Sequence, residues 1–433
     1  MSLGERNNLI KLERGGDRTP HAADQRPAIL PGEITKIGGD GTNGGGSKKS
    51  TRTSPERDFR IDFFRGLALI LIFIDHVPEN FLSYFTLRTF AYSDAAEVFY
   101  FMSGYVAAMV YGRTLLRGGF MACSRQVYKR VWTLYVAHIM LFVLFIAEVS
   151  TSVYKSGNLT YDTDLRVDDF LAQPDIAIIK ALTLQFQPVY LDILPLYIVF
   201  LAFLPFALVA IRRNIWIMLV PSVILYGAVQ IWGFDLPSYP QGHTWYFNPF
   251  AWQLIFLIGA SCGHPSSAER LVALKSPWLL WGAILIAGTC LVTSATTLIH
   301  SLWPAFPPIL AVPPMADKTT LAPIRLINFL CIALLAGRFI PMRSDFWTGR
   351  LAWPIVRCGQ FSLYVFCFTI LLALMGRFVL QEVSASFGMQ LLVNIVGIIA
   401  MMILSTFLAW YRNDGTVPLP PTSSGHKHAE PSS

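Results

Sequence analysis

The sequence predicts an all-α, polytopic membrane protein. Of its 433 residues, 54% are hydrophobic and only 14% are charged, whereas about 25% of the residues in a soluble domain are charged. Apolar runs near the length of a spanning helix, about 20 residues, recur along the chain. The net charge is +7, but the basic residues concentrate in short loops between these runs, as in membrane proteins. We therefore expect membrane lipid, and no nucleic acid, among its partners.

We count ten candidate spanning helices between two polar tails. Residues 1–57 and 411–433 lack apolar runs and are rich in small and polar residues, so both are predicted to be disordered cytoplasmic tails. The membrane domain then covers residues 58–410. Its predicted helices are 59–77, 95–112, 127–149, 189–211, 214–232, 249–264, 278–299, 321–340, 360–380 and 389–410.

Loop charges predict the orientation of these helices. The first tail and every second connection carry clusters of Lys and Arg, whereas the connections between them are poor in both or, in the long loop 150–188, rich in Asp. Because basic loops stay in the cytoplasm, both termini are predicted to be cytoplasmic. Within the long outer loop, residues 168–186 are expected to form an amphipathic or re-entrant helix.

The first predicted helix carries polar groups that hydrophobic burial does not explain. Arg65 and His76 are eleven residues apart, which on a helix places them on one face, about 16 Å apart along the axis. A charged residue inside a span costs about 2.5 to 3.5 kcal/mol, so it usually faces a cavity or a partner. The orientation puts Arg65 toward the cytoplasm and His76 at the outer end.

The same orientation sorts the other intramembrane polar residues into two layers. The outer layer, around His76, should contain Glu97, Asp192, Asn248, Gln253, Arg325 and Asn328, whereas the inner layer should contain Lys129 and Arg130 beside Arg65.

Several polar, small and aromatic residues of the predicted spans and their ends also have a purely structural interpretation. Arg65 at a helix end can pair with Asp62, and Asp192 can satisfy backbone groups freed by Pro195. Ser103 and Gly104 can form a small-residue notch for helix packing. Trp245 can belong to an interfacial aromatic belt, although an aromatic face at an outer opening would also suit a sugar ring.

Several motifs together resemble a known family. Arg65 and His76 with ten residues between them, followed by Phe99-Tyr-Phe-Met-Ser-Gly-Tyr105, are similar to the membrane acyltransferase type 3 superfamily. Three further stretches resemble its OpgC family, namely Leu191-Asp-Ile-Leu-Pro-Leu-Tyr197, Asn248-Pro-Phe-Ala-Trp-Gln253 and Phe361-Ser-Leu-Tyr-Val-Phe-Cys367. The likeness covers roughly residues 57–410, and the segment with Lys129 and Arg130 matches the Arg-rich segment of the superfamily only loosely.

The resemblance implies a multi-pass enzyme of the bacterial inner membrane that moves an acyl group, in OpgC succinyl, from cytoplasmic acyl-CoA to hydroxyls of osmoregulated periplasmic glucans. It implies that His76 is catalytic and that Arg65 helps hold the donor. Neutral imidazole, with an ordinary pKa of about 6.5, suits a general base, which Glu97 or Asp192 would orient.

The remaining roles follow from position. We expect Arg130 and Ser103 near the donor, and Trp245, Asn248 and Gln253 near the acceptor. Acyl-CoA would be a co-substrate, with no permanently bound cofactor, and the cysteines show no metal-ligand spacing. The competing interpretations are a transporter or flippase for a sugar or polar lipid, in which the two layers act as gates, and a sensor or scaffold with a vestigial site.

Overall fold

The computed structural model describes residues 58–78, 80–157, 163–267, 275–306, 316–342 and 344–416. In these ranges the regular structure is helical apart from two isolated bridges, Phe186 with Tyr239 and Pro237 with Thr244. The predicted all-α class is confirmed. The predicted disordered tails lie outside the described residues, except for the first few residues of the second tail, which continue the last helix to Arg412.

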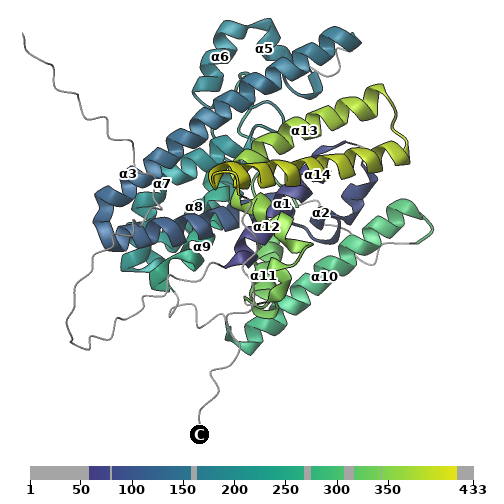
Figure 1. The fold of residues 1–433 in the computed structure, drawn as a ribbon. Coiled ribbons are helices and arrows are strands. Elements are labelled where there is room, and N and C mark those ends of the chain that lie inside the picture. The colour runs from purple at the N-terminus through teal and green to yellow at the C-terminus, as the bar shows by residue number, and fades with distance from the viewer. Residues whose placement is uncertain are drawn as a thin grey trace, which may run out of the picture. The chain divides into compact units, whose positions relative to one another are not determined.

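Figure 1 shows the helices in their order along the chain. The long helices are α1 (Phe59–His76), α3 (Ala95–Ser156), α7 (Ile193–Arg213), α8 (Ile215–Trp232), α9 (Pro249–Gly263), α10 (Pro277–Leu302), α11 (Pro323–Phe339), α13 (Ser362–Glu382) and α14 (Phe387–Arg412). The shorter ones are η1 (Phe81–Phe85), α2 (Leu87–Phe90), α5 (Asp168–Ala172), α6 (Pro174–Leu182), η2 (Pro265–Ser267), η4 (Asp345–Thr348) and α12 (Ala352–Gln360).

Each of the ten predicted spans is found largely within a helix. Six helices of the described chain are long and apolar enough to cross a membrane, namely α3, α7, α8, α10, α13 and α14. Helix α9 is apolar but shorter, and α1 carries several charged residues. The chain therefore has the composition of a multi-pass membrane protein, whereas the number of ten spans and the orientation stay predictions.

Helix α3 contains two of the predicted spans, 95–112 and 127–149, and the connection predicted between them is helical except at Gly119. That residue has φ 75° and ψ −174°, a conformation that favours glycine. Across it, the Thr114 hydroxyl donates to Gln126 Oε1 at 2.7 Å, although twelve residues of straight helix would span about 18 Å. The chain therefore reverses at Gly119, and the two halves of α3 are separate arms, as the sequence predicted.

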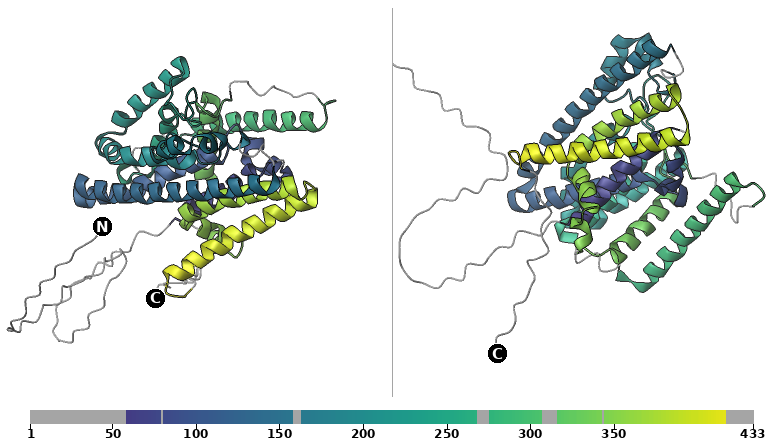
Figure 2. Two further views of the ribbon diagram at one scale, coloured as in Figure 1. Left: turned by 90° about the horizontal axis from the view of Figure 1, so that it is seen from above. Right: turned by 45° about the vertical axis from the view of Figure 1, so that its right-hand side comes forward.

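Helix α1 lies among helices from the far end of the chain, chiefly α12 and α13, and also contacts α3 (Figures 1 and 2). Its crossing with α12 is a backbone contact. A Cβ atom on Gly66 would overlap the carbonyl oxygen of Ile355, and one on Gly359 would overlap that of Asp62. Two glycines thus fix how closely α1 and α12 approach.

The C-terminal end of α1, beyond His76, is tied to α14. The amides of Asn80 and Asn394 bond each other reciprocally at 3.0 and 2.9 Å, and Asn80 Nδ2 also donates to the Ile74 carbonyl. Both asparagines are buried, so the pair fixes the chain immediately after His76. In the following long loop, the predicted helical stretch 168–186 is found as α5 and α6, which lie beside the end of α3 (Figure 1).

Candidate active site

A cavity of about 530 Å³ opens where α1 ends. It is walled by the last turn of α1, the first turns of α3 and α11, and three loops that precede α7, α9 and α11. Its polar lining residues are Asp75, His76, Arg88, Asp94, Arg166, Gln187, Tyr190, Asp192, Tyr246, Lys318 and Arg325. A hollow of this size lined by both charges and aromatic rings is suited to a polar ligand of several functional groups.

His76, the last residue of α1, is half-buried on the wall of this cavity. Its Nδ1 atom lies 2.6 Å from the carbonyl oxygen of Ile72, one turn earlier. Because a carbonyl oxygen only accepts, Nδ1 carries the proton and the neutral ring has its lone pair on Nε2. Nε2 is therefore the nitrogen that can accept a proton from a bound molecule.

A tyrosine from the loop before α7 covers His76. The Tyr190 ring meets the imidazole edge-on, with centroids 4.7 Å apart. Its hydroxyl donates to the carbonyl oxygen of His76 at 3.1 Å. Tyr190 therefore contacts both the ring and the backbone of the histidine.

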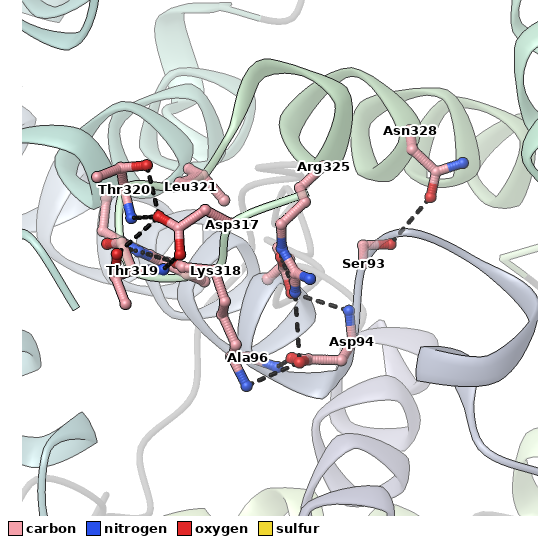
Figure 3. A network of polar contacts seen from close by, with 12 residues as sticks. Ser93, Asp94, Ala96, Asp317, Lys318, Thr319, Thr320, Leu321, Arg325 and Asn328 are labelled. Atoms are coloured by element: carbon pink, nitrogen blue, oxygen red, sulfur yellow. Dashed lines mark hydrogen bonds and ion pairs between the residues drawn. The ribbon is translucent and has the colours of Figure 1, made fainter. Parts of the chain in front are cut away.

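Two carboxylates and two cations form an ion-pair network beside the cavity, and Figure 3 shows Asp94 with Arg325 and Lys318. Asp94 caps α3 and Glu97 completes the capping box. Arg325 of α11 bonds Glu97 through Nε at 2.8 Å and Asp94 through Nη2 at 3.3 Å, while Lys318 Nζ lies 2.7 Å from Asp94. Burial alone would raise the pKa of Asp94, but Lys318 and Arg325 outweigh it and hold that pKa well below its ordinary value. The network joins α3, α11 and the loop before α11.

The other charged groups of the cavity are less constrained. Asp75 accepts from the Thr86 hydroxyl at 2.7 Å. Burial raises the pKa of Asp192, at the start of α7, to about 6, and Lys318 opposes that shift. Arg88 and Arg166 are exposed at the lining, and within the described residues neither has an ion-pair partner.

A comparison with known protein families identifies the family to which the chain belongs. The model of the OpgC protein family matches residues 57–413, which include every residue of the cavity and nearly the whole described chain. The chain belongs to the OpgC family. This membership supports an acyltransferase role in glucan modification. A search of curated proteins found no match.

With the OpgC family in view, the predicted outer layer can be compared with the structure. His76, Asp192 and Arg325 line one cavity, and Glu97 lies behind them, fully buried against Arg325. The orienting partner of the imidazole differs from the prediction. Nδ1 of His76 is bound by the Ile72 carbonyl, not by Glu97 or Asp192, and the Glu97 carboxylate is engaged by Arg325 and the Asp94 backbone.

The residues predicted to contact the acceptor do not line this cavity. The Asn248 side chain caps α9 through Phe250 N at 2.9 Å and donates to the Phe234 carbonyl. Gln253 is bonded to Ser222 on α8, and Trp245 is buried. These contacts occupy Asn248 and Gln253 within the protein, and the neighbours Tyr246 and Phe247 take the places on the cavity wall.

The residues predicted near the donor also lie away from the cavity. Ser103 is buried on α3 beside Gly104, where a Cβ would overlap the Phe256 carbonyl, so the small-residue notch is present. Arg65 donates to the Ser362 hydroxyl at the start of α13. Arg130 is half-buried on the second arm of α3, near Tyr111.

Several residues that line the cavity were not predicted as site residues, although the sequence around some of them has a recognisable pattern. Asp94 with Glu97 has the spacing of a capping box directly before an apolar run. Lys318 lies in one of the predicted connections that are poor in Lys and Arg. Tyr190, Arg88 and Arg166 have no local signal, because their place depends on how three distant loops meet.

Proposed function

We propose that this chain is an O-acyltransferase of the bacterial inner membrane. In this proposal it moves an acyl group, succinyl as the OpgC resemblance implies, from cytoplasmic acyl-CoA to hydroxyls of periplasmic glucans. The observation that supports it most is His76 on the wall of a 530 Å³ cavity with its proton held on Nδ1. Family membership supports the same class of reaction.

His76 acts as the general base. Its Nε2 accepts the proton of a sugar hydroxyl while the hydroxyl oxygen attacks the thioester carbonyl carbon. The tetrahedral intermediate then collapses, the carbon–sulfur bond breaks, and the CoA sulfur leaves and takes up the proton held by imidazolium. The products are a sugar ester and CoA. The Tyr190 and Tyr246 rings offer apolar faces of the kind that pack on sugars.

The donor binds along α1. A CoA thioester separates its phosphates from its carbonyl by a long arm, and Arg65 and His76 occupy positions near the two ends of α1. The Arg65 guanidinium contributes to holding the phosphates, for which its geometry is suited. Its contact with Ser362 keeps it directed toward the start of α13.

A succinyl group carries a second carboxylate, which requires a cation. Arg325 and Arg377 suggest themselves from the sequence, but Arg325 is paired with Glu97 and Asp94, and Arg377 with Asp164. Arg166 and Arg88 line the cavity without such pairs within the described chain. We therefore assign the distal carboxylate to Arg166, with Arg88 as a second cation.

The deciding experiment uses the full-length protein purified in detergent. Succinyl-CoA labelled in the succinyl group is incubated with glucan, and both alkali-labile label on glucan and released CoA thiol are measured. We expect the two products in equal amounts from the wild type and neither from His76→Gln. His243→Gln is the matched control, since His243 is exposed and does not line the cavity.

Two outcomes would overturn the proposal. Full ester formation by His76→Gln would remove the general base. Uptake of glucan or lipid into proteoliposomes with no CoA released would instead show a transporter, the competing function class.

A further inference from the structure

We propose that Tyr190 is a positioning residue for His76, fastened in place by the Arg377–Asp164 ion pair. The inference rests on the proposed function for its effect on turnover, but its effect on the imidazole is independent of that function. Its parts come from three segments: the end of α1, the loop 163–192 and α13.

The imidazole needs a second contact to hold its orientation. The hydrogen bond from Nδ1 to the Ile72 carbonyl opposes rotation of the ring about its Cβ–Cγ bond, but a single bond can break and let the ring swing. The Tyr190 ring, at a centroid distance of 4.7 Å and an interplanar angle of 65°, closes off that swing from one side. Together the two contacts point Nε2 in one direction.

The Tyr190 hydroxyl fixes the backbone beneath the ring. The carbonyl of His76 ends a helix and has no helical partner. It accepts from the Tyr190 hydroxyl at 3.1 Å. The same hydroxyl interacts with the Arg377 guanidinium, which can only donate. The Arg377 guanidinium therefore lies beside the hydroxyl that contacts His76.

The backbone of Tyr190 is held in an unfavourable conformation. Its φ is 77°, in the left-handed region that residues other than glycine seldom occupy. Such a conformation persists only where the surroundings determine it, and it is concentrated at functional sites. Here Val189 N bonds the Leu165 carbonyl on one side and Leu191 N bonds the Pro188 carbonyl on the other. The resulting turn directs the tyrosine side chain at the histidine.

The ion pair fastens the segment that is hydrogen-bonded to that turn. Asp164 precedes Leu165 and lies 2.5 Å from Arg377 Nη2, and Arg377 Nε also donates to Gln381 at 3.2 Å. Arg377 is buried, whereas Asp164 is about half exposed. The pair therefore joins an outer loop to a helix at the point where the loop supports Tyr190.

The test separates the ring from the hydroxyl. Tyr190→Phe keeps the ring and should lower kcat about fivefold, the factor equivalent to one neutral hydrogen bond. Tyr190→Ala removes both contacts and should lower kcat about 100-fold, as misplacing a catalytic group does. The KM for acyl-CoA should not change in either. Tyr135→Phe is the matched control, because it loses the same kind of bond, to the Leu182 carbonyl, elsewhere in the chain.

The second readout is the nitrogen spectrum of His76 in protein labelled with ¹⁵N-histidine, with the signal identified by its loss in His76→Gln. We expect the Nδ1-protonated signal in the wild type and in Tyr190→Phe, and an exchange-averaged signal in Tyr190→Ala. Asp164→Asn should shift it in the same direction, and it decides the question should Tyr190→Ala fail to fold. An unchanged signal in both Tyr190→Ala and Asp164→Asn would overturn the inference. If the signal changes while His76→Gln stays active, the inference stands and the proposed function fails.

Discussion

The two ends of α1 differ in what surrounds them. Near Arg65 the helix meets α12 through backbone at Gly66, and Arg65 itself is bonded to Ser362. Near His76 it meets three loops around a cavity, with aromatic and charged side chains from several elements. One end is thus fixed by helix packing and the other is shaped by loops.

The largest effect should come from a substitution at the His76 end of α1. His76→Gln removes the base and should lower kcat about 1000-fold, within the range for general-base catalysis, with little change in thermal midpoint. Turnover of labelled succinyl-CoA measures the first and differential scanning fluorimetry the second. A variant that is active but unstable would show that His76 serves packing instead.

The next effect concerns the ion-pair network beside the cavity. Arg325→Met leaves the carboxylate of Glu97 buried without its cation, and should lower the free energy of unfolding by about 3 to 5 kcal/mol. Adding Glu97→Gln should restore much of the loss, since the unpaired charge is then gone. Denaturant titration in detergent compares the variants. Equal stability of Arg325→Met and wild type would show that the network contributes nothing to the fold.

A smaller effect should distinguish succinyl-CoA from acetyl-CoA at the cavity beside His76. Arg166→Gln should raise the KM for succinyl-CoA about tenfold, the factor for a hydrogen bond to a charged group, and leave that for acetyl-CoA unchanged. Arg213→Gln, an exposed arginine at the end of α7, is the control. An equal rise for both donors would assign Arg166 to some other part of CoA.

The helix-packed end should show a more modest change. Arg65→Gln should raise the KM for acyl-CoA about fivefold, as expected for a partly solvated ion pair, with kcat unchanged. Ser362→Ala, which removes the hydrogen bond that Arg65 donates to Ser362, should have less effect. A fall in kcat at unchanged KM would contradict a donor-binding role.

The last effect is one of pH. Burial raises the pKa of Asp192 from 3.8 to about 6, so between these values the folded protein binds the proton that the unfolded chain has lost. The contribution of Asp192 to stability therefore falls as pH rises through this window. Asp192→Asn should match the wild type in thermal midpoint near pH 4 and exceed it near pH 8. A difference that is constant with pH would contradict the shift.

Much of the helical framework could be predicted from the sequence, because apolar length is a local property. Arg65 and His76 lie on one helix, as predicted, and the chain reverses between the second and third predicted spans. His76, Asp192 and Arg325 were predicted from the loop charges to lie at one depth in the membrane, and all three line the cavity.

Depth says nothing about which way a side chain faces, and the acceptor residues show why. Asn248 and Gln253 lie near the start of α9, but one caps the helix and the other faces α8. The Asn248-Pro249 pair is itself a helix-start signal. Tyr190 and Arg166, with φ of 77° and 56°, could not be placed from sequence, since their backbone conformations are set by contacts between loops far apart in the chain.

The crossing of Gly66 with α12 has a consequence for biosynthesis. Most partners of α1 belong to the last part of the chain, α12 to α14, which is synthesised long after α1 has emerged from the ribosome. Until then Gly66 of α1 cannot pack against the α12 backbone, and Asn80 lacks its hydrogen bonds to Asn394. The Asn80–Asn394 pair can therefore form only after α14 has been synthesised, so the packing beside the histidine end of α1 is completed late in assembly.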